Sequence, residues 1–360
     1  MSEASKFLEG HKVLDLSDEK GMFCGKLLSD MGAEVTRIEK PGPRYEITEA
    51  DYAYLNDGKK VISLDLDTTA GRRKFRLLVK SADIVIETES PGIMEKRRPG
   101  YSSLSKLNPG LIMASITDFG QEGPYSKHKS TELVAEAIGG WMSVTGEPES
   151  PLKLYGSQAY YTASLFAANG VMLALWDRHA TGRGQHIDIS VMDCVAGTLD
   201  HTLVRYAYEG AVSERRGSRH WNDAFRVLSC TDGYVLLSLF QNWETLIEWL
   251  ASEGMAADLV DEKWKDRGEQ GRGAEHIIQV LEKWTLTHTV AELVEKGQLM
   301  HFPWGEVATV SQLLESPQMA EREFFKEVEI KGKRGKAPGT LVKLERLPRL
   351  RLRDGSTGSP

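Results

Sequence analysis

The chain has 360 residues, of which 41% are hydrophobic and 27% charged, and its formal net charge is −7. This composition is typical of globular proteins, and the acidic balance argues against general binding to nucleic acid. No stretch reaches the roughly 18 uninterrupted apolar residues of a membrane span, so we expect no membrane partner. Cys24, Cys194 and Cys230 are too far apart for a disulfide framework or a zinc site. We therefore expect a cytoplasmic protein without a metal centre.

The N-terminal half alternates short apolar runs with helical patterns. Apolar runs that predict strands occur at 12–16, 34–38, 61–66, 83–86 and 111–116. Helical patterns lie between them at 21–31, at 68–80 and up to residue 108. Strands that alternate with helices indicate βαβ units and a parallel sheet. Further on, we predict helices at 132–143, 162–178 and 191–208, with a strand at 186–189. The fold class is therefore α/β, with a Rossmann-like large domain.

The first turn of this domain does not fit a dinucleotide-binding protein. Such proteins carry a G-x-G-x-x-G motif after the first strand, where the glycines let the backbone approach a pyrophosphate. Residues 17–25 lack that motif, and they include Asp18 and Glu19, which would repel phosphate.

The pattern changes after Gly210. Residues 225–229 and 233–238 predict a hairpin, and helical patterns rich in tryptophan follow it. We divide the chain into an N-terminal part of the large domain (1–210), a smaller α+β domain (218–303), a segment that returns to the large domain (304–353) and a disordered tail (354–360). Within the return segment, residues 341–353 alternate apolar and basic side chains, which is typical of a strand.

Five segments, in this order and at this spacing, resemble the class III (CaiB/BaiF, formyl-CoA transferase-like) CoA-transferases. They are Lys12–Ser17, Leu28–Gly42, Asn108–Ile112, Phe119–Tyr125 and Arg178–Gln185. The resemblance covers about residues 10–209. It implies a CoA thioester as substrate, no covalently bound cofactor, and two chains whose domains are linked into an interlocked dimer.

In this family an aspartate at the start of a helix attacks the thioester, with a small residue four positions later and a glycine ten positions later. Ser164 and Gly170 match these two positions, so the place of the nucleophile falls on Tyr160. A phenol of pKa about 10 is mostly protonated at neutral pH and cannot form the anhydride intermediate. We therefore predict no catalytic residue in this chain and interpret Tyr160 as an aromatic side chain that fills an unused acyl pocket.

Glu132 is an acid at a position where the family also has one, at the start of the helix predicted at 132–143. One interpretation is a favourable charge at a helix N-terminus, and the other is a substitute nucleophile. The racemases of the superfamily have a histidine next to this acid, but here the neighbour is Thr131. The missing histidine argues against racemase activity.

The resemblance assigns Lys40, Lys96 and Lys129 to the phosphates and pantetheine of CoA. Three other positions depart from the family pattern, because Thr88 and Glu89 replace residues that bracket adenine and Asp67 replaces a lysine. An acid beside phosphate is repulsive. The three lysines are therefore either a residual CoA site or solvated surface charges.

The leading hypothesis is a non-catalytic subunit of a heteromeric CoA-transferase, paired as a heterodimer or heterotetramer with a homologue that retains the aspartate. The nearest type in the family acts on succinyl-CoA and benzylsuccinate in anaerobic toluene degradation, and one of its subunits lacks the aspartate. The alternatives are a homodimeric enzyme that uses Glu132 or another acid, and a pseudoenzyme that binds CoA thioesters. The sequence leaves the acyl donor and acceptor open.

Overall fold

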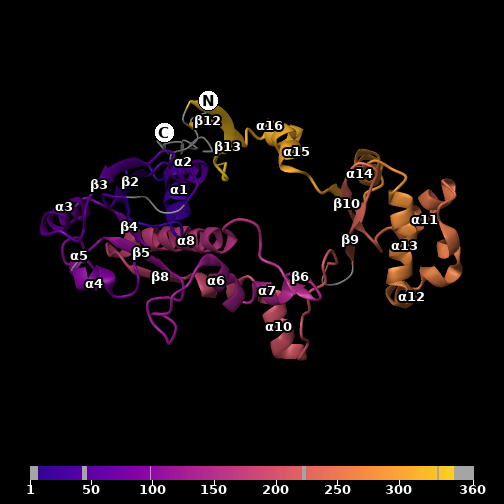
Figure 1. The fold of residues 1–360 in the computed structure, drawn as a ribbon, viewed down its shortest axis with the longest axis horizontal. Helices are drawn as coiled ribbons and strands as arrows, with labels where there is room; N and C mark the ends of the chain where they lie inside the picture. The colour runs from indigo at the N-terminus through magenta and orange to yellow at the C-terminus, as the bar shows by residue number, and fades with distance from the viewer. Residues whose placement is uncertain (1–6, 43–46, 98, 221–223, 331, 344–360) are drawn as a thin grey trace, which may run out of the picture. The chain divides into compact units, whose positions relative to one another are not determined.

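The computed structural model describes residues 7–42, 47–97, 99–220, 224–330 and 332–343. The chain forms two compact units (Figure 1). Unit 1 comprises residues 1–141, 154–210 and 320–360, and unit 2 comprises residues 142–153 and 211–319. Unit 2 thus includes the predicted smaller domain and also takes residues 142–153, 211–217 and 304–319.

Unit 1 is built on a six-stranded sheet with the order β3-β2-β1-β4-β5-β8, in which every pair is parallel. The strands are β1 (Lys12–Asp15), β2 (Glu34–Glu39), β3 (Lys60–Ser63), β4 (Ile84–Glu87), β5 (Ile112–Thr117) and β8 (His186–Ser190). This sheet confirms the predicted α/β fold class. The strand order reverses between β1 and β4, and in such sheets ligands bind outside the carboxyl ends of the strands at that point.

Helices cover both faces of the sheet (Figure 1). On one face, α1 (Met22–Asp30) and α8 (Gln158–Thr181) pack against strand residues such as Val13 and Ile84. On the other face, α3 (Thr69–Val79), α4 (Ile93–Arg97) and α5 (Tyr101–Leu104) pack against Leu14 and Val85. Neighbouring residues of one strand point to opposite faces, so these buried strands are apolar on both sides.

Two predicted helices are interrupted. The pattern at 132–143 forms α6 (Glu132–Ile138) and α7 (Trp141–Val144), because Gly140 adopts a φ of 96° and a Cβ on Gly139 would lie 2.5 Å from Val195. The pattern at 191–208 forms α9 (Val191–Gly197) and α10 (Asp200–Glu209). Thr198 caps α9 and accepts a hydrogen bond from Trp141 Nε1 (2.6 Å).

Other elements differ in extent. Helix α8 begins at Gln158 rather than at 162, and the strand predicted at 61–66 is β3, which ends at Ser63. Sequence analysis missed α2 (Glu49–Asn56), although Thr48 caps it by accepting a hydrogen bond from Asp51 N.

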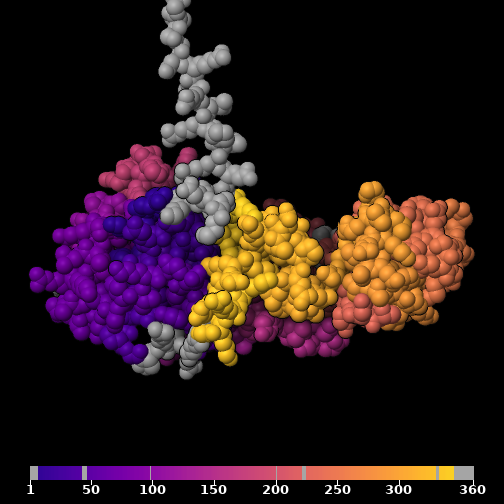
Figure 2. All heavy atoms as spheres, turned by 90° about the horizontal axis from the view of Figure 1, so that it is seen from above, coloured from indigo at the N-terminus to yellow at the C-terminus, as the bar shows by residue number. Residues whose placement is uncertain are grey.

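Sequence analysis also missed a hairpin of β12 (Phe325–Ile330) and β13 (Lys333–Pro338). In Figure 2 this yellow hairpin lies against the indigo N-terminal elements, where Lys326 pairs with Asp57 and Asp30. Residues 341–343 form no strand, and the rest of the strand predicted at 341–353 lies outside the described residues.

Unit 2 contains the predicted hairpin, β9 (Phe225–Ser229) and β10 (Tyr234–Ser238), and β11 (Gly305–Glu306) pairs with β10. Its other elements are β6 (Gly146–Glu147), β7 (Ser150–Pro151), α11 (Trp243–Ser252), α12 (Arg267–Arg272), α13 (Ala274–Thr285), α14 (Val290–Leu299), α15 (Val310–Glu315) and short 3-10 turns at Ala257–Val260 and Glu262–Lys265. Helix α16 (Pro317–Glu321) begins in unit 2 and ends in unit 1. Glu253 organises the tryptophan core by accepting hydrogen bonds from Trp249 Nε1 (2.8 Å) and Trp284 Nε1 (2.6 Å).

Among the helices of the described ranges, none is long and apolar enough to cross a bilayer.

A buried ionic cluster lies at the carboxyl end of β1. Lys59 Nζ donates to Asp15 Oδ2 (2.8 Å), and Arg37 Nη1 lies 3.4 Å from Asp15 Oδ1. All three residues are buried, and Gly25 of α1 leaves room for them, because a Cβ there would lie 2.6 Å from Asp15 Oδ2. Burial raises the pKa of Asp15, but the charges of Lys59 and Arg37 outweigh it and hold this pKa below its ordinary value. Asp15 is therefore ionised at neutral pH.

We expect Lys59→Met to lower the free energy of unfolding by about 3–5 kcal/mol, because it leaves the buried carboxylate of Asp15 with one cationic partner fewer. Lys60→Met is the matched control, since the neighbouring Lys60 is exposed. Urea unfolding of both variants measures the difference. If both variants lose the same free energy of unfolding, the buried Lys59 contributes no more to stability than an exposed lysine.

A second buried acid, Glu87, lies at the end of β4. Its side chain is 2% exposed, and its Oε2 accepts a hydrogen bond from Glu89 N (2.7 Å). Burial raises the pKa of Glu87 to about 7. A carboxyl whose pKa is raised on folding contributes most to the free energy of unfolding below its unfolded pKa. For Glu87 this contribution is lost as the pH rises through 7.

Glu87→Gln should therefore leave stability nearly unchanged at about pH 5 and increase it, by on the order of 3 kcal/mol, at about pH 8.5. Glu34→Gln, at the exposed start of β2, serves as the control. Thermal unfolding across this pH range tests the expectation. A stability difference between Glu87→Gln and the native chain that does not change with pH would contradict it.

Candidate active site

The turn from Leu16 to Gly21 connects β1 to α1 and lies at the point where the strand order reverses. Ser17 Oγ donates to Asp15 Oδ1 (2.5 Å), and Ser17 O accepts from Arg37 Nη1 (2.7 Å). A Cβ on Gly21 would lie 2.7 Å from the Cβ of Ser17, so the turn closes tightly. The buried ionic cluster thus fixes the backbone that presents Asp18, Glu19 and Lys20.

Tyr160 lies in the first turn of α8, 4% exposed, beside this turn. Ser164, one helical turn later, donates from Oγ to Lys20 O (2.9 Å). Lys20 Nζ lies 5.9 Å from the centre of the Tyr160 ring, a distance at which a cation and an aromatic ring attract each other. Tyr160 therefore sits at a helix start inside the core and not on the outer surface. Its equivalence to the family's nucleophile remains a prediction.

The surroundings of Tyr160 are acidic. Burial raises the pKa of the Tyr160 phenol, and the charges of Asp118, Glu19, Asp18 and Glu132 raise it further. The phenol is therefore protonated at neutral pH. Burial works against the charged form of Lys20, yet Asp18 (2.5 Å), Asp118 and Glu19 together hold the pKa of Lys20 above its ordinary value. Lys20 is thus the cation that offsets this group of acids.

Glu132 and Asp118 differ in what their oxygens contact. Glu132 is in the first turn of α6, and its Oε1 accepts a hydrogen bond from Ala159 N (3.2 Å) at the start of α8. This contact fits the interpretation of Glu132 as a helix N-terminal charge. Asp118 follows β5, and its Oδ1 is buried without a hydrogen-bond partner among the described residues. Burial raises the pKa of Asp118, and Lys20 offsets part of that rise. Sequence analysis did not single out Asp118.

The structure brings two of the three predicted CoA lysines toward one acid. Lys40, after β2, donates from Nζ to Asp67 Oδ2 (2.6 Å), and both side chains are largely exposed. Lys96, on α4, lines a cavity of about 530 Å³ together with Asp67 and Arg97. Lys129 is exposed in the loop between β5 and α6. Among the described residues, no contact connects it to Lys40 or Lys96.

The positions that depart from the family pattern have partners inside the protein. Thr88 is buried, and its Oγ1 accepts a hydrogen bond from Asp18 N (2.8 Å). Glu89 Oε1 pairs with Arg97 Nη1 (2.5 Å), and Arg97 Nε pairs with Asp67 Oδ1 (2.8 Å). Asp67 and Glu89 therefore neutralise Arg97, which sequence analysis missed because Lys96 alone was matched to the family position.

Comparisons with known proteins agree with this architecture. The chain is 29% identical to the succinyl-CoA:(R)-benzylsuccinate CoA-transferase subunit BbsE of Thauera aromatica, over 87% of this chain and 82% of that protein. It is 32% identical to the succinyl-CoA:mesaconate CoA-transferase of Haloarcula hispanica, over 90% and 86% of the two chains. The crystal structure of a CaiB/BaiF family protein from Brucella suis superimposes with a TM-score of 0.81 at 30% identity, covering 89% of this chain and 88% of that one. The model of CoA-transferase family III matches residues 8–356, and the chain therefore belongs to this family.

Proposed function

We propose that this protein is a subunit of a heteromeric class III CoA-transferase and that a homologous partner chain supplies the aspartate nucleophile. The observation that carries the proposal is Tyr160, which is buried at the start of α8 within a group of acids that raise the pKa of its phenol. A carboxylate forms the acyl anhydride of this chemistry, whereas a protonated phenol does not. The likeness to BbsE, which is named as a subunit of a CoA-transferase for succinyl-CoA and benzylsuccinate, supports the same substrate pair for the complex.

Exposed apolar side chains support a partner chain. Helix α8 buries one face in the core but leaves Leu173 70% and Trp176 80% exposed, and Leu165 and Phe166 on the same helix are also exposed. On α10, Tyr206 and Tyr208 are exposed as well. Large exposed apolar groups on one unit indicate a protein interface. An interlocked pair of chains, as the family resemblance implies, would bury them.

A second candidate is a homodimeric transferase that uses another acid of this chain. Glu132 is a poor choice because one of its oxygens holds the start of α8. Asp118 is better suited, because its Oδ1 is buried near Tyr160 with no hydrogen-bond partner in the described part of the chain. Under this candidate, Asp118→Asn would abolish the activity of the chain purified alone.

The decisive experiment is co-expression with a family member that retains the aspartate, followed by a transferase assay with succinyl-CoA and benzylsuccinate. We expect the two chains to co-purify and the complex to be active, while this chain alone is inactive. Replacing the partner's aspartate with alanine should abolish activity, whereas Tyr160→Phe in this chain should change it by less than about threefold, since it removes only a hydroxyl. Transferase activity of this chain as a monomer or homodimer would overturn the proposal.

Restoring the aspartate should harm the chain. Tyr160→Asp places a further carboxylate in a buried site near Asp118, Glu19 and Asp18, so we expect a loss of more than about 3 kcal/mol of unfolding free energy at neutral pH. Tyr160→Phe keeps the ring and should cost less than about 1.5 kcal/mol. Urea unfolding of both variants measures the contrast, and a Tyr160→Asp chain as stable as the Tyr160→Phe chain would show that the pocket still tolerates a nucleophile.

A further inference from the structure

Three neighbouring strands of unit 1 carry polar side chains on the face of the sheet that meets α3, α4 and α5. Glu87 of β4 is the register partner of Ser115 of β5, and His186 of β8 is the partner of Met113, two residues before Ser115. Ser115 Oγ hydrogen-bonds to the Glu87 carboxylate and lies 2.8 Å from His186 Nε2. Glu87 and Ser115 are buried, whereas His186 is exposed. The three side chains therefore form a continuous chain of hydrogen bonds from the surface to the interior.

The order of these groups differs from that of a hydrolytic triad. In such a triad the histidine lies between the carboxylate and the serine, and the serine faces the substrate. Here Ser115 lies in the middle and is 0% exposed, so it cannot attack a substrate. A hydroxyl between two groups can accept a proton from one of them and donate its own proton to the other. The arrangement is therefore suited to proton transfer and not to nucleophilic attack.

A proton can travel along this chain without the movement of a heavy atom. While Glu87 is ionised, Ser115 donates to it, and the Nε2–H of His186 donates to Ser115. When solvent protonates His186 Nδ1, the Nε2–H bond breaks as an O–H bond forms on Ser115, and the original hydroxyl proton of Ser115 passes to the Glu87 carboxylate. Glu87 ends neutral, and His186 ends neutral with its proton on Nδ1. The reverse sequence returns the proton to solvent.

The surroundings of Glu87 favour its neutral form. Burial raises the pKa of Glu87 to about 7, although hydrogen bonds from Ser115 and from Glu89 N lower it. The negative charges of Glu89 and Glu95 raise this pKa further, because they repel the ionised carboxylate. Glu87 therefore gains and loses its proton close to neutral pH.

The surroundings of His186 keep the additional proton off the imidazole. Burial lowers the pKa of His186, and the charges of Asp188 and Glu95 offset part of that change. Tyr101 of α5 stacks on the imidazole, with 5.2 Å between the ring centres. Burial raises the pKa of the Tyr101 phenol, so this neighbour is neutral. When Glu87 and His186 together hold one additional proton, that proton therefore lies on Glu87.

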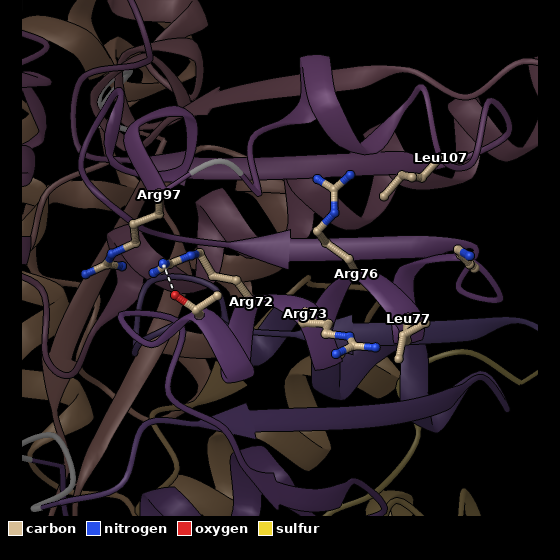
Figure 3. A pocket seen from close by; sticks show the side chains of 8 residues that line it. Arg72, Arg73, Arg76, Leu77, Arg97 and Leu107 are labelled. Atoms are coloured by element: carbon tan, nitrogen blue, oxygen red, sulfur yellow. Dashed lines mark hydrogen bonds between the residues drawn. The ribbon is translucent and has the colours of Figure 1, made fainter.

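The chain of hydrogen bonds reaches the candidate active site through the turn that follows β4. Glu87 Oε2 accepts from Glu89 N (2.7 Å), and Thr88, which lies between them in the chain, accepts from Asp18 N (2.8 Å). Glu89 also pairs with Arg97, which lines the cavity on the outer side of α3 (Figure 3). A carboxylate accepts a stronger hydrogen bond than a neutral carboxyl does. Protonation of Glu87 therefore weakens the contact that holds this turn.

We propose that Glu87, Ser115 and His186 form a proton relay that connects the surface to the turn after β4 and makes this turn respond to pH. Above neutral pH the Glu87 carboxylate holds Glu89 N firmly, and below it the neutral carboxyl holds Glu89 N weakly. The relay lies outside the group of acids around Tyr160, and it goes beyond the proposed function.

NMR spectroscopy of the full chain with isotope-labelled histidine rings tests the relay, together with the partner where the two co-purify. His186→Gln identifies the signals of His186 among the nine histidines. As the pH falls from about 8.5 through 7, we expect the proton of His186 to move from Nε2 to Nδ1. The protection of the Glu89 amide against hydrogen exchange, corrected for the intrinsic effect of pH, should fall by about fivefold, because a neutral acceptor binds more weakly than a charged one.

Two variants separate the relay from a titration of His186 by itself. Glu87→Gln carries a neutral amide that can donate to Ser115, so His186 should hold its proton on Nδ1 even at about pH 8.5. Ser115→Ala removes the connection, and the tautomer of His186 should no longer change as the pH passes through 7. Thr117→Val is the matched control, because it removes a buried hydroxyl on the same strand outside the relay. It should preserve the tautomer change.

The proposal is overturned if His186 gains a second ring proton and becomes a cation as the pH passes through 7, or if its tautomer never changes. A tautomer change that persists in Ser115→Ala would also overturn it. If Ser115→Ala fails to fold, Glu87→Gln decides by itself, since an unaltered tautomer change in that variant would exclude Glu87 as the acceptor of the proton. These signals require no transferase activity, so either result leaves the assignment of a partner-supplied aspartate to its own assay.

Discussion

The contact of Asp15 with Lys59 and Arg37 is the interaction on which the candidate site depends. It lies between the sheet and α1, and the same side chains also fix the backbone next to it, because Lys59 donates to Met22 O and Arg37 donates to Ser17 O. The turn between these carbonyls is therefore held at both ends. Buried charges destabilise a protein unless their hydrogen bonds are satisfied. Here the remaining N–H donors of Lys59 and Arg37 bind backbone carbonyls and so fix the turn beside α8.

The acids around Tyr160 make sense only together with that tyrosine. A neutral aromatic ring lets Asp18, Glu19 and Asp118 come near one another with Lys20 as the nearby cation, and Lys20 also lies over the ring. An ionised aspartate at the same place would add repulsion from each of these acids. The surroundings thus match the tyrosine that is present at residue 160.

Sequence patterns predicted the parallel sheet well, because its buried strands are apolar on both faces and stand out as short continuous runs. They failed where contacts between distant residues determine the local structure. The break between α6 and α7 follows from the φ of 96° at Gly140 and from the close approach of Gly139 to Val195, and the sequence shows only the pair of glycines. The hairpin of β12 and β13 has a largely polar sequence, and its contacts with distant residues include the pairing of Lys326 with Asp57. For the site, motif spacing placed Tyr160 at a helix start, but the position of Asp118 near it emerges only from the packing of distant segments.

Among the described residues, the hydrogen bonds that set the start of α8 do not involve the side chain of residue 160. Glu132 accepts from Ala159 N, and Ser164 donates to Lys20 O, so the helix is anchored by its neighbours and by its backbone. The side chain of residue 160 could therefore change without loss of the frame around it. Under the proposed function, this independence would let a family member retain the whole fold with a tyrosine at residue 160.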